Sequence, residues 1–246
     1  MAFLLILLPA PAGAQVDYRN LDDDRPTRVT DAFPIERFAF ELSVPYRATF
    51  EGGKSDHAFS PHLEYGIARN LMVGVGADFA LGGRIGEESQ GSVSALWNPL
   101  RETPSLPGFG VTVSVRGPGF SRANLLVGAL ATRSFGRTRV HGNVVARLAS
   151  PGATSGSESR WWAGLAIDQT LLRTSTLLVA DLIAEETESG RTIGWIGEVG
   201  LRKQISPTLV FHAGVGQGLG GSARGTRLNL GLSHAFGVRR LMGRVS

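Results

Sequence analysis

The stretch from Ile35 to Phe50 alternates between apolar and polar residues almost without interruption. Its apolar positions, which share one face of an extended chain, are Phe38, Phe40, Leu42, Val44, Tyr46, Ala48 and Phe50. A period of two is the pattern of a β-strand with one apolar and one polar face. Sixteen residues at about 3.3 Å each reach roughly 50 Å, enough to cross the ~30 Å apolar layer of a bilayer. The stretch therefore favours a membrane-spanning β-barrel.

The same alternation recurs along the chain and predicts twelve strands between residues 35 and 236. The connections alternate in character, because tight turns such as Arg69-Asn70 are followed by polar loops. The expected loops include Glu51–Asp56, Gly82–Ser89 and Ser150–Ser159. Bacterial outer-membrane barrels have an even number of strands, short periplasmic turns and longer external loops. We predict an all-β fold, a closed antiparallel transmembrane β-barrel of about 12 strands in a bacterial outer membrane.

Ionisable residues fall on one face only of the clear predicted strands. In a soluble sandwich or barrel that face meets water, whereas in an outer-membrane barrel it lines the lumen and lipid covers the apolar face. Alternation fits both folds, and strand number, strand length and an export signal favour the membrane barrel. The residues predicted to line the lumen are Arg37, Glu41, Arg47, His62, Glu64, Asp78, Arg116, Arg139, His141, Arg147, Asp168, Glu198, Arg202 and His212.

Charges of both signs are nearly balanced on this inward face, which predicts a ladder of arginine–carboxylate pairs across the lumen, since an unpaired buried charge is costly. Glycines such as Gly74, Gly76, Gly164, Gly200 and Gly214 share the face. We expect them to let long arginine and glutamate side chains cross the lumen. A barrel of this size is narrow beside the 16–18-stranded porins, so the ladder leaves a thin path or none.

The N-terminus has the features of an export signal. Phe3–Leu8 is a short apolar core, and Ala12-Gly13-Ala14 is a small-x-small cleavage site that leaves Gln15 as the first mature residue. The core has no preceding positive charge, which a start codon assigned too late would explain, and a frayed apolar terminus is the alternative. The chain is then divided into a signal peptide (1–14), an irregular periplasmic lead-in (15–34), the barrel (35–236) and a C-terminal tail (237–246).

Several kinds of chemistry find no support in the sequence. The chain has no cysteine, which removes disulfides, thiol nucleophiles and zinc–thiolate sites. The sequence pI is about 10.1, but no basic cluster with interleaved aromatics predicts nucleic-acid binding. The glycine-rich run 216–221 leads into a strand rather than a helix, so no cofactor site is expected. The histidines form no short-spaced metal pair, and no Gly-x-Ser-x-Gly motif indicates an enzyme.

Three segments carry a resemblance to a known family. They are Asn98–Pro107 with the strand that follows to Arg116, Thr132–Gly136 with Arg139–Asn143, and Trp162–Asp168. Together they resemble the bacterial outer-membrane proteins grouped as "MetA-pathway of phenol degradation" or transporter-like barrels, over roughly residues 30–236. The resemblance implies an outer-membrane β-barrel that passes small organic molecules. One departure is that ten residues follow Phe236, whereas outer-membrane chains commonly end at an aromatic residue.

The leading hypothesis is a passive channel for small organic solutes, apolar or aromatic by the resemblance. One alternative is a structural or adhesive barrel with a plugged lumen, and another is an outer-membrane lipid hydrolase. The expected partners are outer-membrane lipids, the barrel assembly machinery and a small-molecule solute.

Overall fold

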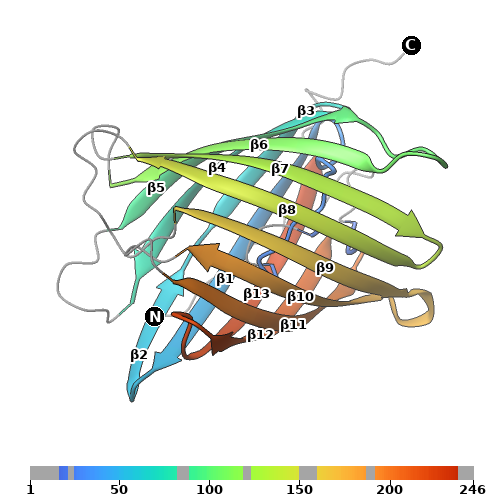
Figure 1. Ribbon diagram of the computed structural model, residues 1–246. Helices are drawn as coiled ribbons and strands as arrows, with labels where there is room; N and C mark the ends of the chain where they lie inside the picture. Colours follow the sequence, from blue (N-terminus) through green and yellow to red (C-terminus); the bar gives the residue numbers. More distant parts are fainter. Residues whose placement is uncertain are drawn as a thin grey trace, which may run out of the picture.

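The computed structural model describes residues 17–21, 25–81, 89–118, 123–149, 160–186 and 192–237. Here the chain forms one antiparallel sheet that closes on itself (Figure 1). The strands are β1 (Ala39–Glu51), β2 (Lys54–Phe59), β3 (His62–Ala68), β4 (Leu71–Ala80), β5 (Gln90–Leu100), β6 (Gly108–Gly117), β7 (Asn124–Phe135), β8 (Thr138–Ala149), β9 (Trp161–Leu171), β10 (Thr176–Glu186), β11 (Ile193–Ser206), β12 (Leu209–Gly220) and β13 (Thr226–Gly237). Among the described residues, no helix is long and apolar enough to cross a membrane.

The barrel closes between its first and last strands. β1 pairs with β13 in an unbroken register from Ala39 opposite Gly237 to Phe50 opposite Thr226. β2 and β3 both pair with β1 and with β4, so they share one position in the wall. The thirteen strands therefore fill twelve positions, which confirms the predicted closed antiparallel barrel.

The wall is interrupted where β2 ends and β3 begins. Pro61 has no backbone N–H and cannot continue the hydrogen-bonded ladder. The neighbouring groups bond around it, because the N–H of Ser60 donates to the carbonyl of Pro45 at 3.0 Å and the N–H of Ala77 donates to that of Pro61 at 3.1 Å. The single strand predicted between the Glu51–Asp56 loop and the Arg69-Asn70 turn is thus two short strands, β2 and β3.

The connections differ from the prediction at two places. The expected loop Glu51–Asp56 is a two-residue hairpin turn at Gly52 and Gly53, whose φ angles of +57° and +75° suit glycine in a type I′ turn. β12 also continues through Gly220, so most of the glycine-rich run is strand. The expected loops 82–89 and 150–159 fall almost wholly outside the described residues.

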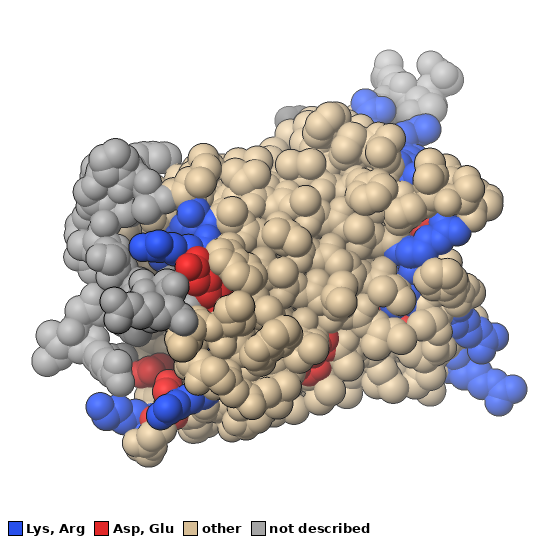
Figure 2. Space-filling model, viewed as in Figure 1, with Lys and Arg blue, Asp and Glu red and all other residues tan. Residues whose placement is uncertain are grey.

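The outer surface carries an apolar belt. Leu165 is 67% exposed, and Val75, Val144 and Val199 are each more than half exposed. Figure 2 shows a broad, mostly uncharged band with arginine and lysine gathered toward the two ends of the barrel. The apolar strand faces therefore point outward, where lipid is their solvent, and the closed sheet leaves no unpaired edge inside the bilayer.

Two described stretches before β1, residues 17–21 and 25–34, lie inside the barrel (Figure 1). We call these two stretches together the lumenal segment. Leu21 and Val29 are enclosed together with wall residues Leu177, Ile183 and Ile196. The sequence predicts an irregular periplasmic lead-in here, whereas the described part of the stretch lies in the lumen, because its apolar side chains and backbone amides find partners on the inner wall. Signal cleavage after residue 14 stays a prediction.

Candidate functional site

The wall strands β8, β10 and β11 hold the lumenal segment by its backbone. Three consecutive N–H groups donate to wall side chains: Arg28 to Glu198 at 2.8 Å, Val29 to Asp181 at 3.1 Å and Thr30 to Asn143 at 2.7 Å. The Arg28 guanidinium also pairs with Glu185 of β10 at 2.5 Å. Hydrogen bonds to buried charged acceptors are among the strong ones in proteins. This part of the segment is therefore fixed to one side of the lumen.

Asp31 joins the two described parts of the lumenal segment. Its backbone N–H donates to the carbonyl of Leu21 at 3.0 Å, and its carboxylate accepts the N–H of Leu21 at 3.1 Å and that of Phe33 at 3.0 Å. The same carboxylate pairs with Arg139 of β8 at 3.3 Å. Asp31 is 1% exposed. One buried carboxylate thus holds residues 17–21 to residues 25–34 and ties both to the wall.

A buried polar row continues from Arg139 along the wall. Arg139 pairs with Asp168 at 2.6 Å, and the same carboxylate lies 2.9 Å from Nε2 of His141, whose Nδ1 is 3.0 Å from the Thr132 hydroxyl. Carboxylate, imidazole and hydroxyl stand in the order used by hydrolases. His141 and Thr132 have no exposed surface, however, and the Thr132 oxygen accepts the N–H of Ala32 at 3.0 Å. The row therefore positions the segment and has no access for a substrate.

Arg25 reaches the opposite wall. Its guanidinium donates to the hydroxyl of Ser43 on β1 and to Glu64 on β3, the latter at 2.9 Å. Its carbonyl accepts a hydrogen bond from Arg202 of β11 at 3.2 Å, and Arg202 lies 3.9 Å from Glu41. The predicted ladder of arginines and carboxylates exists, and several of its cations come from the lumenal segment.

Inward glycines make room for the segment. A Cβ at Gly164 would lie 2.6 Å from Cγ2 of Val29, and one at Gly200 would lie 2.6 Å from Cγ of Pro26. A Cβ at Gly214 would lie 2.4 Å from the carbonyl oxygen of Pro26. These glycines were expected to let charged side chains cross the lumen, and in the structure they accommodate backbone and side chains of residues 26–29.

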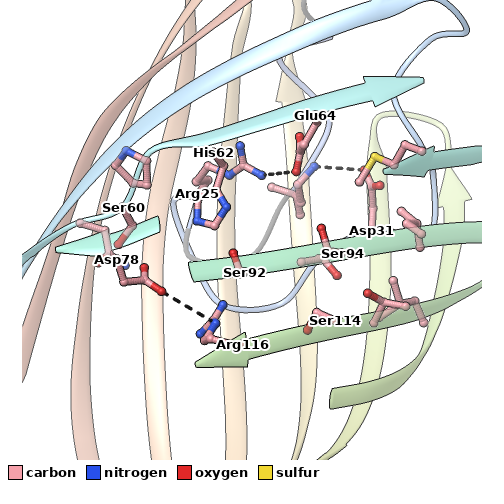
Figure 3. A pocket seen from close by; sticks show the side chains of 18 of the residues that line it. Arg25, Asp31, Ser60, His62, Glu64, Asp78, Ser92, Ser94, Ser114 and Arg116 are labelled. Carbon is pink, nitrogen blue, oxygen red and sulfur yellow. Dashed lines mark hydrogen bonds and ion pairs between the residues drawn. The ribbon is translucent and has the colours of Figure 1, made fainter. Parts of the chain in front are cut away.

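A cavity of about 140 Å³ lies between the segment and a part of the wall formed mostly by β3 to β6, with both polar and apolar side chains in its lining. Its wall includes the short side chains of Ser92, Ser94 and Ser114, which leave space between the wall and the segment. Figure 3 shows the polar lining: Arg25 and Asp31 from the segment, and Ser60, His62, Glu64, Asp78, Ser92, Ser94, Ser114 and Arg116 from the wall. Arg116 pairs with Asp78 at 3.8 Å. We call this space the upper cavity.

The predicted lumen-lining residues separate into groups. Arg47, His62, Glu64, Asp78 and Arg116 line the upper cavity. Those enclosed against the segment or within the wall network are Glu41, Arg139, His141, Asp168, Glu198, Arg202 and His212, while Arg147 is half-buried on β8.

Arg37 is the exception. It is exposed in the turn before β1, and its guanidinium lies 4.2 Å from the ring centre of Phe38. Phe38 has a φ of +67°, which breaks the alternation before the strand begins, and the lumenal position of Arg37 stays a prediction.

Some residues of the site were not predicted from the sequence, namely the partners on the segment and two uncharged wall residues. Arg25, Arg28 and Asp31 precede the first strand, where no period marks an inward side. Thr132 and Asn143 lie on inward positions of β7 and β8 and bond to segment backbone. Their alternation with lipid-facing neighbours was a usable signal for the two wall residues.

Comparisons with known proteins agree with this fold. No family model and no curated protein sequence matches the chain. Among solved structures, the KdgM porin is 15% identical with a TM-score of 0.60, covering 79% of this chain and 99% of its own. An outer membrane channel from Pseudomonas putida F1 is 15% identical with a TM-score of 0.58, covering 84% and 98%. Outer membrane phospholipase A from Escherichia coli is 12% identical with a TM-score of 0.50, covering 89% and 96%.

These likenesses are to outer-membrane barrels. With the apolar belt, they place the protein in a bacterial outer membrane. The narrower resemblance to the phenol-degradation group stays a prediction.

Proposed function

We propose that the protein is an outer-membrane channel for small polar organic solutes, which pass along the wall of β3 to β6. The observation that carries the proposal is the upper cavity, a space beside the lumenal segment that is lined by hydroxyl, imidazole and charged groups together with the apolar side chains of Leu21, Met72, Leu96 and Leu130. A channel must present groups that replace the water around its solute without holding it tightly. Serine hydroxyls on a glycine-rich wall supply such groups.

The lining favours polar over apolar solutes. The resemblance implied apolar or aromatic molecules, but burying the cavity's polar groups against an apolar solute costs free energy for each hydrogen bond lost. Arg47 and Arg116 can bind a carboxylate, and the serines can bind hydroxyls. The KdgM porin has been solved in complex with disordered oligogalacturonate, which makes sugar acids a class to test.

The test is solute flux into liposomes that contain the purified protein. We expect liposome swelling with a neutral monosaccharide and with a sugar acid, and little with a phenolic solute in excess of its passage through lipid alone. A Ser94→Leu variant, which fills the upper cavity, is expected to lower the flux several-fold. Absence of flux for every solute, or flux of the phenolic solute only, would contradict the proposal.

The occupied lumen also favours a second candidate, a structural barrel with a plugged lumen. The same assay separates the two, since a plugged barrel gives no flux even at high protein density. For its partners we propose outer-membrane lipids around the apolar belt and the barrel assembly machinery during insertion.

A further inference from the structure

A second cavity lies on the other side of the Leu21–Asp31 pair from the upper cavity. It measures about 280 Å³, at the end of the barrel where β1 begins, and is lined by Asp17, Arg19, Glu36, Glu41, Ser134 and Arg139 among others. We call it the lower cavity. Leu21 and Asp31 line the upper cavity, and their neighbours Asn20 and Phe33 line the lower one. The hydrogen-bonded pair Leu21–Asp31 therefore lies at the boundary between the two spaces.

Residues 17–21, which we call the arm, have few attachments. Within the described residues, the hydrogen bonds that leave the arm go to two residues, Asp31 and Arg139. Asp31 exchanges two hydrogen bonds with Leu21, at 3.0 and 3.1 Å, and lies 3.3 Å from the side-chain amide of Asn20. Arg139 donates to the carbonyl of Arg19. The remaining contacts of the arm are the packing of Leu21 and Tyr18 against buried wall residues.

Residues 25–34 are attached differently. Their bonds are spread over β1, β3, β5, β7, β8, β10, β11 and β13. Both side-chain nitrogen and oxygen of Asn143 bond to Thr30, and the Asn98 amide donates to the carbonyl of Ala32 at 2.8 Å. Loss of any one of these bonds leaves the others in place. Within the described part of the chain, loss of Asp31 removes most of the hydrogen bonds that leave the arm.

We infer that the arm is the gate of the channel and that Asp31 and Arg139 are its latch. Residues 25–34 stay on the wall, and movement of the arm joins the upper cavity to the lower one. The inference rests on the proposed function, because a gate has meaning only if solute passes. It assigns to Asp31 and Arg139 a role in positioning the arm.

The first experiment follows the arm without using flux. The chain has no cysteine, so a Leu21→Cys variant carries one thiol, at a position 1% exposed. The probe is a membrane-impermeant maleimide that reaches the barrel through water. We expect slow labelling in this background and labelling about tenfold faster after Asp31→Ala, the shift that loss of one or two hydrogen bonds produces. The matched control is Glu102→Ala, a carboxylate at the same end that bonds to Ser134.

Equal labelling rates in the Asp31→Ala and Glu102→Ala proteins would overturn the inference. Folding of each variant is checked by its shift in mobility on unheated gels, which a barrel that has not closed does not show. If Asp31→Ala fails to fold, Asp31→Asn keeps the size of the residue and removes its charge, and the same labelling comparison applies.

The second experiment locks the arm. Tyr18 packs against the cluster formed by Ala39, Val210 and Ala235, so we choose a Tyr18→Cys/Ala235→Cys pair to be joined by a short thiol-reactive cross-linker. We expect cross-linking to suppress solute flux in liposomes and a cleavable linker to restore it on reduction, while either single-cysteine variant is unaffected. Flux that persists with the arm locked would overturn the gate and leave the channel intact. Absence of flux in every variant, Asp31→Ala included, would overturn the proposed function and the gate with it.

Discussion

The two sides of the lumen have the same strand pattern and opposite contents. The side formed by β7 to β11 presents Asn143, Asp181 and Glu198 inward, and these side chains bind consecutive amides of the lumenal segment. The side formed by β3 to β6 presents Ser92, Ser94 and Ser114 inward, and a cavity remains there. The comparison shows that alternation builds the wall, whereas the size and charge of the inward residues decide whether a sector holds the segment or leaves space.

The largest change in the free energy of unfolding is expected from Arg139→Ala, on the side of the lumen formed by β7 to β11. The substitution leaves the carboxylates of Asp31 and Asp168 buried beside one another without their shared cation. Removing one partner of a buried ion pair costs about 3–5 kcal/mol in the free energy of unfolding. Urea titration in detergent micelles, followed by tryptophan fluorescence, measures it. Arg137→Ala, an exposed arginine in the adjacent turn, is the control and should change little. Similar free energies of unfolding for the two variants would show that ion pairing does not hold the lumenal segment to the wall.

Adding the same side chain to each side comes next. Gly164→Leu places atoms where Val29 now lies, since even a Cβ would be 2.6 Å from Val29 Cγ2. We expect the free energy of unfolding to fall by about 2–3 kcal/mol through overpacking. Ser94→Leu enters the upper cavity and should cost less than about 1 kcal/mol, because free space is available there. If the two substitutions destabilise the protein equally, the contrast between the sides is not one of packing.

Asn143→Ala tests the hydrogen bonds between a wall side chain and the backbone of the lumenal segment, without a change of charge. Its amide accepts the N–H of Thr30 at 2.7 Å and donates to the Thr30 carbonyl at 3.0 Å. Leaving both backbone groups unpartnered in a closed space is expected to cost about 1–2 kcal/mol. Ser114→Ala, on the cavity side, is the matched control with a change near zero. A loss confined to the Ser114 variant would reverse the assignment of the two sides.

The smallest change in stability is expected from Arg116→Gln in the cavity. Its pair with Asp78 is partly exposed and long, at 3.8 Å, so the loss should be below about 1 kcal/mol. Selectivity should respond instead, because removing one cation leaves Asp78 in the path. We expect the reversal potential in a salt gradient across a planar bilayer to move toward cation preference, whereas Arg101→Gln, an exposed arginine outside the barrel wall, leaves it unchanged. An unchanged reversal potential in the Arg116→Gln variant would show that ions do not pass through the upper cavity.

The barrel could be predicted from sequence because lipid imposes a strict period. Leu165 outward and Asp168 inward follow from parity alone, and the closed register of β1 with β13 agrees with it. The contents of the lumen could not be predicted in the same way. Residues 17–34 have no repeat that marks a face, and their partners are distant in sequence, so Arg25 and Glu64 meet only in the folded chain. Pairs of inward arginines and carboxylates were predicted and are present, but the arginines that the segment itself supplies, Arg25 and Arg28, were not among the predicted residues.

The contacts of the segment also set the order in which the molecule can be completed. The hydrogen bond from Val29 to Asp181 joins residues 152 apart, and the one from Asn229 to Pro26 joins residues 203 apart. Such distant pairs form late and make folding slow. The lumenal segment is synthesised before every strand, yet its hydrogen bond with Asn229 can form only after β13 has been added. Pairing of β13 with β1 then closes the barrel around the segment.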